Sequence, residues 1–178
     1  QKRTSACEPM LVELDFRLLG PLEVLDGGRP IQLGGPKPRA LVAVLALQPG
    51  YVLSVDRLVD DLWGEHAPDS APHAVKVYVS TLRKAIGTAT IATRAGGYAL
   101  EVDPDRVDLH RFAQLVDEAR QAKPLVAAAT LREALALWRG PALEEFGEPF
   151  AVRERVRLES LRLSALEDRV DADLARGE

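Results

Sequence analysis

The feature of this sequence that most constrains its fold is a pair of alternating stretches that bracket three helical ones. Apolar and polar residues alternate on both sides of "DGG" from about Phe16 to Leu33, which is typical of a β-hairpin. A second alternation, "TIATRAGGYALEV", predicts another hairpin that closes near Val102. The segments between them have helical periodicity. We therefore expect the order strand, strand, helix, helix, helix, strand, strand.

Capping and breaking residues delimit these three helices. The first is expected to begin near Arg39 and to stop at "QPG". Ser54 is expected to cap the second helix, which Gly64 ends. Ser70 is expected to cap the third, with Pro72 tolerated in its first turn, and "AIG" ends it.

From Val107 onward the pattern is helical only. Three segments, "DLHRFAQLVDEARQA", "LVAAATLREALALWRG" and a long one from about Phe150 to Arg176, each carry apolar residues on one face. This pattern predicts stacked antiparallel helices. The fold class is therefore mainly α with small β-sheets, in two domains at 11–103 and 106–178. The last helix has no predicted cover, so we expect the sequence to be part of a longer protein.

Composition excludes several classes of function. The chain has 178 residues, one cysteine (Cys7) and three scattered histidines, so neither a disulfide nor a metal site is expected. "LGGPKPR" lacks the residues of a phosphate-binding loop, and no cofactor is expected. We expect Asp56, Asp60 and Asp61 on the wet face of the second helix, because no catalytic partner is near. No apolar run is long enough for a membrane span, which predicts a cytoplasmic protein. Because the sequence offers no nucleophile, metal ligand set or cofactor loop, we do not expect an enzyme.

Charge is distributed unevenly along this acidic chain. The net charge is −4, yet residues 70–100 hold four Lys or Arg and no Asp or Glu. A solvated helix in an acidic protein normally carries both signs, because Glu–Lys pairs support it. DNA phosphates attract Lys and Arg and repel carboxylates, so a DNA-facing surface would exclude acids. The alternative is an acid-poor helix covered by another domain.

A helical wheel divides the third helix into two faces. Its buried stripe is predicted to be Val75, Val79, Leu82 and Ile86. The opposite face collects His73, Val77, Ser80 and Lys84, with Thr81 on one flank and Lys76 and Arg83 on the other. Lys, Arg, Ser and Thr read base edges in the major groove. Arg94, at the tip of the second hairpin, is placed to reach a narrow minor groove.

Seven motifs carry a resemblance to a known family. They are "FRLLGPLEV", "PKPRALVAVLAL", "LVDDLWG", "YVSTLRKAIG", "GGYAL", "VDLHRFAQLVDEA" and "ALALWRGPALEEF". In this order they resemble the Streptomyces antibiotic regulatory proteins, the AfsR-like activators, from Phe16 to Glu178. The first domain resembles the winged helix-turn-helix of the OmpR/PhoB class. The second resembles the family's bacterial transcriptional activation domain, a tetratricopeptide-like helical array.

The resemblance implies a transcriptional activator. Such proteins bind direct repeats in double-stranded DNA near promoters as side-by-side protomers and recruit the RNA polymerase holoenzyme, here for antibiotic or secondary-metabolite genes on the nucleoid. Matching positions give the candidate DNA contacts, which are Lys76, Tyr78, Ser80, Thr81, Arg83, Lys84 and, in the wing, Arg94. Tyr78 lies beside the buried stripe, so its hydroxyl is expected to contact a phosphate. Gly96, Gly97 and Tyr98 are expected to shape the wing.

Two further groups of residues stay open at this stage. Lys37 and Arg39, at the start of the first helix, are expected either to contact the DNA backbone or to be solvated. Glu65, His66 and Asp69 lie in a connection longer than a tight helix-turn-helix needs. They are expected either to contact RNA polymerase or to form a loop without a partner. Trp63 and Trp138 are expected to anchor the two cores.

Two rival functions fit parts of the pattern. A response-regulator output module has the same fold but needs a receiver domain, and only about fifteen residues precede the first strand. A helical protein-interaction adaptor whose winged domain has lost DNA affinity is the other rival. Binding to duplex DNA distinguishes the adaptor from the activator.

Overall fold

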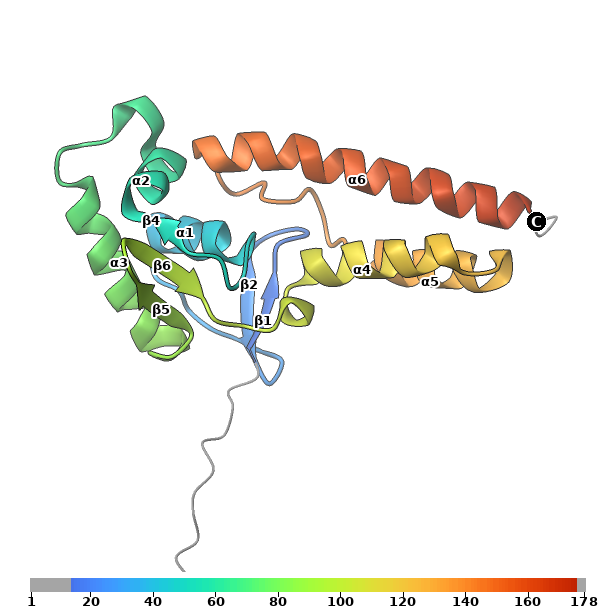
Figure 1. Ribbon diagram of the computed structural model, residues 1–178, viewed down its shortest axis with the longest axis horizontal. Coiled ribbons are helices and arrows are strands. Elements are labelled where there is room, and N and C mark those ends of the chain that lie inside the picture. The colour runs from blue at the N-terminus through green and yellow to red at the C-terminus, as the bar shows by residue number, and fades with distance from the viewer. Residues whose placement is uncertain (1–13, 176–178) are drawn as a thin grey trace, which may run out of the picture.

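The first hairpin belongs to a three-stranded antiparallel sheet (Figure 1). In the computed structural model, which describes residues 14–175, the strands are β1 (Leu14–Arg17), β2 (Glu23–Asp26) and β3 (Arg29–Pro30). Gly27 and Gly28 both have positive φ, as the tight turn between β2 and β3 requires. The predicted hairpin is confirmed, with β1 added on the far side of β2. The predicted domain start at residue 11 lies outside the described residues.

Three helices follow this sheet. They are α1 (Pro36–Ala46), α2 (Val55–Trp63) and α3 (Ala71–Ile86), with a short 3-10 turn, η1 (Gly64–His66), between the last two. The first helix begins three residues before Arg39, because proline is tolerated in a first helical turn. Ser54 caps α2 as predicted, since its hydroxyl accepts the Arg57 N–H at 3.1 Å. Ser70 precedes α3 as predicted but makes no side-chain cap.

The second hairpin forms the wing. Strands β5 (Ile91–Arg94) and β6 (Gly97–Leu100) pair as predicted, and β4 (Leu53–Ser54) joins the other edge of β6. Gly97 makes this third strand possible, because a Cβ at this position would lie 2.0 Å from the Leu53 carbonyl oxygen. The close approach ties the wing to the start of α2.

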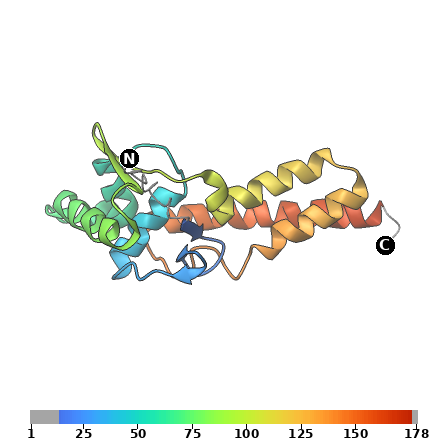
Figure 2. The same cartoon turned by 90° about the horizontal axis from the view of Figure 1, so that it is seen from below.

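The rest of the described chain is helical. After a 3-10 turn, η2 (Pro104–Arg106), come α4 (Asp108–Gln121), α5 (Pro124–Ala136) and the long α6 (Pro149–Leu174). Helix α5 packs against both α4 and α6. The Trp138 ring, buried as predicted, meets Phe112 edge-on with ring centroids 5.5 Å apart. These helices extend away from the wing, and α3 lies at the opposite end of the molecule (Figures 1 and 2).

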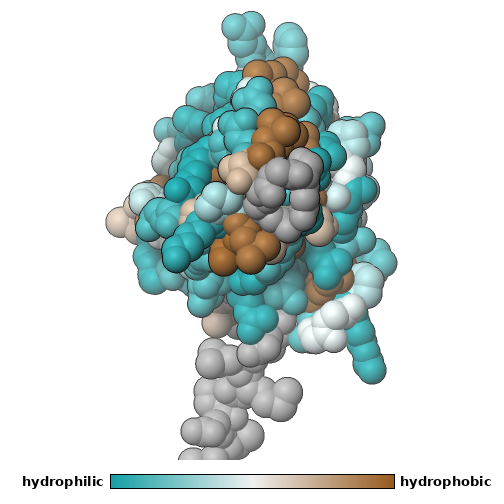
Figure 3. Space-filling view, turned by 90° about the vertical axis from the view of Figure 1, so that its right-hand side faces the viewer, coloured by the Kyte–Doolittle hydropathy of each residue, from teal (hydrophilic) through white to brown (hydrophobic). Residues whose placement is uncertain are grey.

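Apolar side chains remain exposed on the helical domain. They include Val156, Leu163, Val170 and Leu174 on α6. Seen from the end remote from α3, patches of brown hydrophobic surface lie among hydrophilic groups (Figure 3). The amphipathic pattern of α6 is therefore only partly satisfied by its packing on α5.

One hydrophobic core runs through both domains. It joins the buried stripe of α3 to α1, to β1 and to the inner faces of the helical domain. The predicted stripe is confirmed, with Val75, Val79, Leu82 and Ile86 all at most 2% exposed. Phe16 of β1, fully buried, forms a parallel bridge with Val107 just before α4. The two domains therefore bury apolar surface against each other and are not joined by a linker alone.

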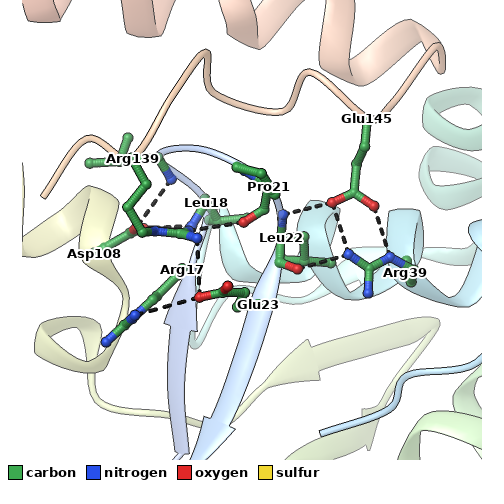
Figure 4. Close-up of polar contacts among 10 residues, drawn as sticks. Arg17, Leu18, Pro21, Leu22, Glu23, Arg39, Asp108, Arg139 and Glu145 are labelled. Carbon is green, nitrogen blue, oxygen red and sulfur yellow. Dashed lines mark hydrogen bonds and ion pairs between the residues drawn. The ribbon is translucent and has the colours of Figure 1, made fainter. Parts of the chain in front are cut away.

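Two carboxylates, Asp108 and the more exposed Glu145, join the domains near the end of β1 (Figure 4). Asp108 accepts the backbone N–H groups of Leu18 and Leu19 at 2.7 and 3.0 Å. Burial raises the pKa of Asp108, and the two N–H groups oppose that rise. Glu145 accepts the Leu22 N–H at 2.6 Å and both ends of the Arg39 guanidinium fork at 2.8 Å. Two acids of the helical domain thus fix the β1–β2 connection.

A third carboxylate corrects a sequence-based expectation. Asp61 is 3% exposed and does not lie on the wet face of α2, unlike its neighbours Asp56 and Asp60. Its carboxylate pairs with Arg57 of the same helix at 2.8 Å and with Arg153 of α6. The wheel of an isolated helix could not show this, because the second arginine is 92 residues away.

Gly97→Ala should open the β4–β6 pair, because the new methyl group would overlap the Leu53 carbonyl. Overpacking of this kind costs about 1–3 kcal/mol. We expect the free energy of unfolding, measured by urea denaturation, to fall by about that amount. Gly147→Ala is the matched control, since a Cβ there meets nothing within 4 Å and the glycine has no positive φ. Equal stability of the two variants would contradict the assignment.

Candidate nucleic-acid interface

The outward face of α3 is exposed and carries no acidic residue. The exposed side chains on it are His73, Lys76, Val77, Ser80, Thr81 and Lys84. The opposite face packs on α1 and α2. The predicted division into a buried stripe and a polar, cationic face is therefore confirmed. Such a ridge offers hydrogen-bond donors and positive charge to a groove lined by phosphates.

Tyr78 lies at one edge of this face. Its half-buried ring stacks on Trp63 at the end of α2, with centroids 6.2 Å apart and an interplanar angle of 20°. The Lys37 ammonium lies 5.2 Å from the centroid of the same Trp63 ring. Trp63 is thus an anchor between α1, α2 and α3, as predicted. The stack directs Tyr78 along the flank of the helix and away from the centre of the exposed ridge.

Arg83, on the other flank, holds the wing against α3. Its Nε and Nη2 donate to the Ile91 carbonyl at 2.9 and 2.6 Å, and Nη2 also donates to the Thr93 hydroxyl at 2.8 Å. The guanidinium also lies 6.0 Å from the Tyr98 ring centroid. The side chain is half-buried. Arg83, which the sequence predicts as a DNA contact, therefore also positions the wing within the protein.

Thr81 and Arg94 differ in how far contacts within the protein occupy their polar groups. The Thr81 hydroxyl donates to the Val77 carbonyl at 3.1 Å, and its methyl group faces Gly34, where a Cβ would lie 3.7 Å away. Arg94 ends β5 with its side chain 55% exposed and pairs with Glu101 at 2.7 Å. Exposed pairs of this kind contribute only about 0–1 kcal/mol. A phosphate or a groove could therefore replace Glu101 at little cost.

Lys37 and Arg39 are both held by protein oxygens, and their side chains are 33% and 27% exposed. The Lys37 ammonium donates to the Leu62 carbonyl at 2.6 Å and to Glu148 at 3.2 Å. Arg39 is held by Glu145 and by the Leu22 carbonyl (Figure 4). Both cations therefore belong to the interface between the domains. Helix position alone could not show this, because the partners come from the segment before α6.

The connection between α2 and α3 is exposed. It includes η1, and Glu65, His66 and Asp69 all present their side chains to solvent. Gly64 at its start lies close to the helical domain, since a Cβ there would be 3.1 Å from a ring carbon of Pro149. This connection is therefore an exposed surface next to the start of α6.

Other kinds of site find no support in the described part of the chain. Residues 14–175 contain no group of three His, Cys, Asp or Glu side chains that could hold a metal ion. Cys7 lies outside this range. Within the same range, no helix is both long and apolar enough to cross a membrane.

Comparisons with known proteins agree with this geometry. Residues 28–100 match the family described as "Transcriptional regulatory protein, C terminal", and residues 107–178 match the "Bacterial transcriptional activator domain". A winged helix with a cationic helix face, followed by these helices, defines a transcriptional regulator. These are families of regulators and not of enzymes, as predicted.

Individual relatives narrow the class. Regulatory protein AfsR of Streptomyces coelicolor is 39% identical over 92% of this chain and 17% of its own length. Regulatory protein DnrI of Streptomyces peucetius is 35% identical over 92% of this chain and 66% of its own. The chain belongs to the Streptomyces antibiotic regulatory protein family of AfsR-like regulators. It spans 17% of the length of AfsR and 66% of the length of DnrI.

A solved structure shows the same arrangement. EmbR of Mycobacterium tuberculosis, in complex with a low affinity phosphopeptide, superposes with a TM-score of 0.87 and 31% identity. The match covers 93% of this chain and 46% of EmbR. The predicted fold, a winged helix followed by a helical activation domain, is therefore confirmed.

Arg83→Ala should loosen the wing, because the Ile91 carbonyl and the Thr93 hydroxyl lose their shared donor. We expect faster amide hydrogen exchange in β5 and β6, with little change in α4. Arg83→Lys should not restore protection, since an ammonium cannot reproduce the planar fork. Lys84→Ala, one residue along and exposed, is the matched control. If the amide hydrogen exchange rates of β5 and β6 were the same in Arg83→Ala as in the parent chain, the positioning role of Arg83 would be refuted.

Proposed function

We propose that this chain is the DNA-binding part of a transcriptional activator. It binds direct repeats in double-stranded DNA near promoters, as two protomers side by side, with α3 in the major groove and the wing at the minor groove. The observation that carries the proposal is the acid-free outer face of α3 beside the exposed Arg94. Such a protein acts on the chromosome, in the cytoplasm. The family supports a role in genes for antibiotic or secondary-metabolite biosynthesis.

The proposed contacts follow from the geometry. Lys76, Ser80 and Lys84 lie on the open ridge of α3 and are assigned to base edges or phosphates. Arg94 is assigned to the minor groove, where a narrow groove attracts a guanidinium. Tyr78 and Thr81 are assigned to the edges of the footprint, because their side chains also contact the protein. Lys37, Arg39 and Arg83 are left out, since protein partners hold their cationic groups.

The placement of the helical domain supports this assignment. Asp108 and Glu145 hold that domain on the β1–β2 connection, and α4 and α5 extend from there away from α3 (Figure 1). The domain therefore leaves the α3 ridge and the wing open to a duplex. An adaptor would not require the acid-free outer face of α3 to be exposed in this way.

Selection of bound sites from a random duplex library should recover spaced direct repeats. With about four to seven phosphate contacts per protomer, log K should fall against log salt with a slope of about −0.9 per neutralised phosphate. Lys84→Ala should weaken binding to the recovered site by about 1–3 kcal/mol and relax its specificity, because a base-edge contact is lost.

The control for this experiment is Lys123→Ala, which removes one exposed cation from the helical domain. It should bind as the parent chain does. Recovery of no motif, with weak and salt-sensitive binding only, would overturn the proposal and favour the adaptor. Equal weakening of all sequences by Lys84→Ala would reassign this side chain to a phosphate.

We also propose that the α2–α3 connection contacts the RNA polymerase holoenzyme. Glu65, His66 and Asp69 are exposed beside the start of α6 and lie outside the α3 ridge. Replacing all three by Ala should lower transcription from a promoter with the recovered site several-fold while leaving DNA affinity unchanged. In vitro transcription and gel-shift titration measure the two effects. Loss of DNA affinity would instead place these residues in the DNA footprint.

A further inference from the structure

Val77 is an apolar side chain in the middle of the polar α3 ridge. It is 47% exposed, and among the residues described it is the one large exposed hydrophobic side chain on α3. The others lie in the loop before β4 or on α5 and α6. His73, Ser80 and Lys84 share its face at helical spacing, and all three are exposed. Val77 is therefore surrounded by groups suited to polar partners.

Packing within the chain does not account for this valine. The buried stripe of α3 is complete on the opposite side, where Val75, Val79 and Leu82 are at most 1% exposed. Helix propensity gives no reason either, because valine is a weaker helix former than alanine at an exposed position. The side chain thus offers apolar surface in the direction in which Ser80 and Lys84 offer donors.

In the major groove this surface has one complementary group. The base edges present hydrogen-bond donors and acceptors, and their single apolar group is the 5-methyl of thymine. The neighbouring Thr81 does not compete for it, because its own methyl faces Gly34 and its hydroxyl is bonded to the Val77 carbonyl. We propose that Val77 is a specificity-determining residue that contacts the 5-methyl group of one thymine in each half-site.

This inference rests on the proposed function and is tested with the duplex that site selection recovers. Each thymine of a half-site is replaced in turn by deoxyuridine, which removes the methyl group and keeps the base pair. One replacement should weaken binding of the parent chain about fourfold, the effect of burying one methyl group (about 0.8 kcal/mol). Val77→Ala should weaken binding to the thymine duplex by a similar factor. It should show no further loss on the deoxyuridine duplex.

Val156→Ala is the matched control, because it is an exposed valine (71% exposed) on α6 and not on the α3 ridge. It should keep the full fourfold response to deoxyuridine. Val77→Ala is expected to fold normally, because alanine favours an exposed helix, and circular dichroism checks this. Equal responses of the parent chain and Val77→Ala at every position would overturn the inference while leaving the proposed function intact. Absence of any sequence-specific site would instead defeat both.

Discussion

The buried carboxylate of Asp108 is the constraint on which the arrangement of the two domains depends. It accepts two adjacent backbone N–H groups at the end of β1, which have no strand partner there. An unpaired buried N–H costs about 1–3 kcal/mol, so the first turn of α4 must stay on this connection. Glu145 and Arg139 add further bonds to the same connection (Figure 4). The helical domain is consequently held in one orientation relative to α3.

Cations in this chain serve two separate purposes, and their partners distinguish them. Arg39, Lys37 and Arg83 are held by protein oxygens and fix the positions of elements. Lys76 and Lys84 stay exposed on a ridge where no carboxylate lies nearby in the sequence. Counting basic residues would merge these groups, whereas the hydrogen-bond partners separate them. A small set of exposed side chains on α3 is therefore left for the proposed contact with DNA.

The sequence predicted most of what local periodicity controls. Both hairpins, the cap of α2 by Ser54 and the buried stripe of α3 followed from spacing alone. Strand β4 was missed because two residues cannot show an alternation. The roles of Asp61 and Arg39 were missed because their partners lie about a hundred residues away in the sequence. The exposed ridge was predicted. The contacts of Arg83 and Tyr78 were needed to show that these two flanking residues also stabilise the fold.

Ser54 takes part in two structures at once, since it pairs with Gly97 of the wing and caps α2. Helix α2 in turn packs on α3, and Arg83 of α3 donates a hydrogen bond to the Ile91 carbonyl in the wing. The position of the wing relative to α3 is therefore set by covalent geometry and hydrogen bonds. In the proposed complex with DNA, this fixed arrangement would set the spacing of the two grooves that α3 and the wing contact. Base sequences that adjust their groove width at low energetic cost would then be favoured even at positions that no side chain touches.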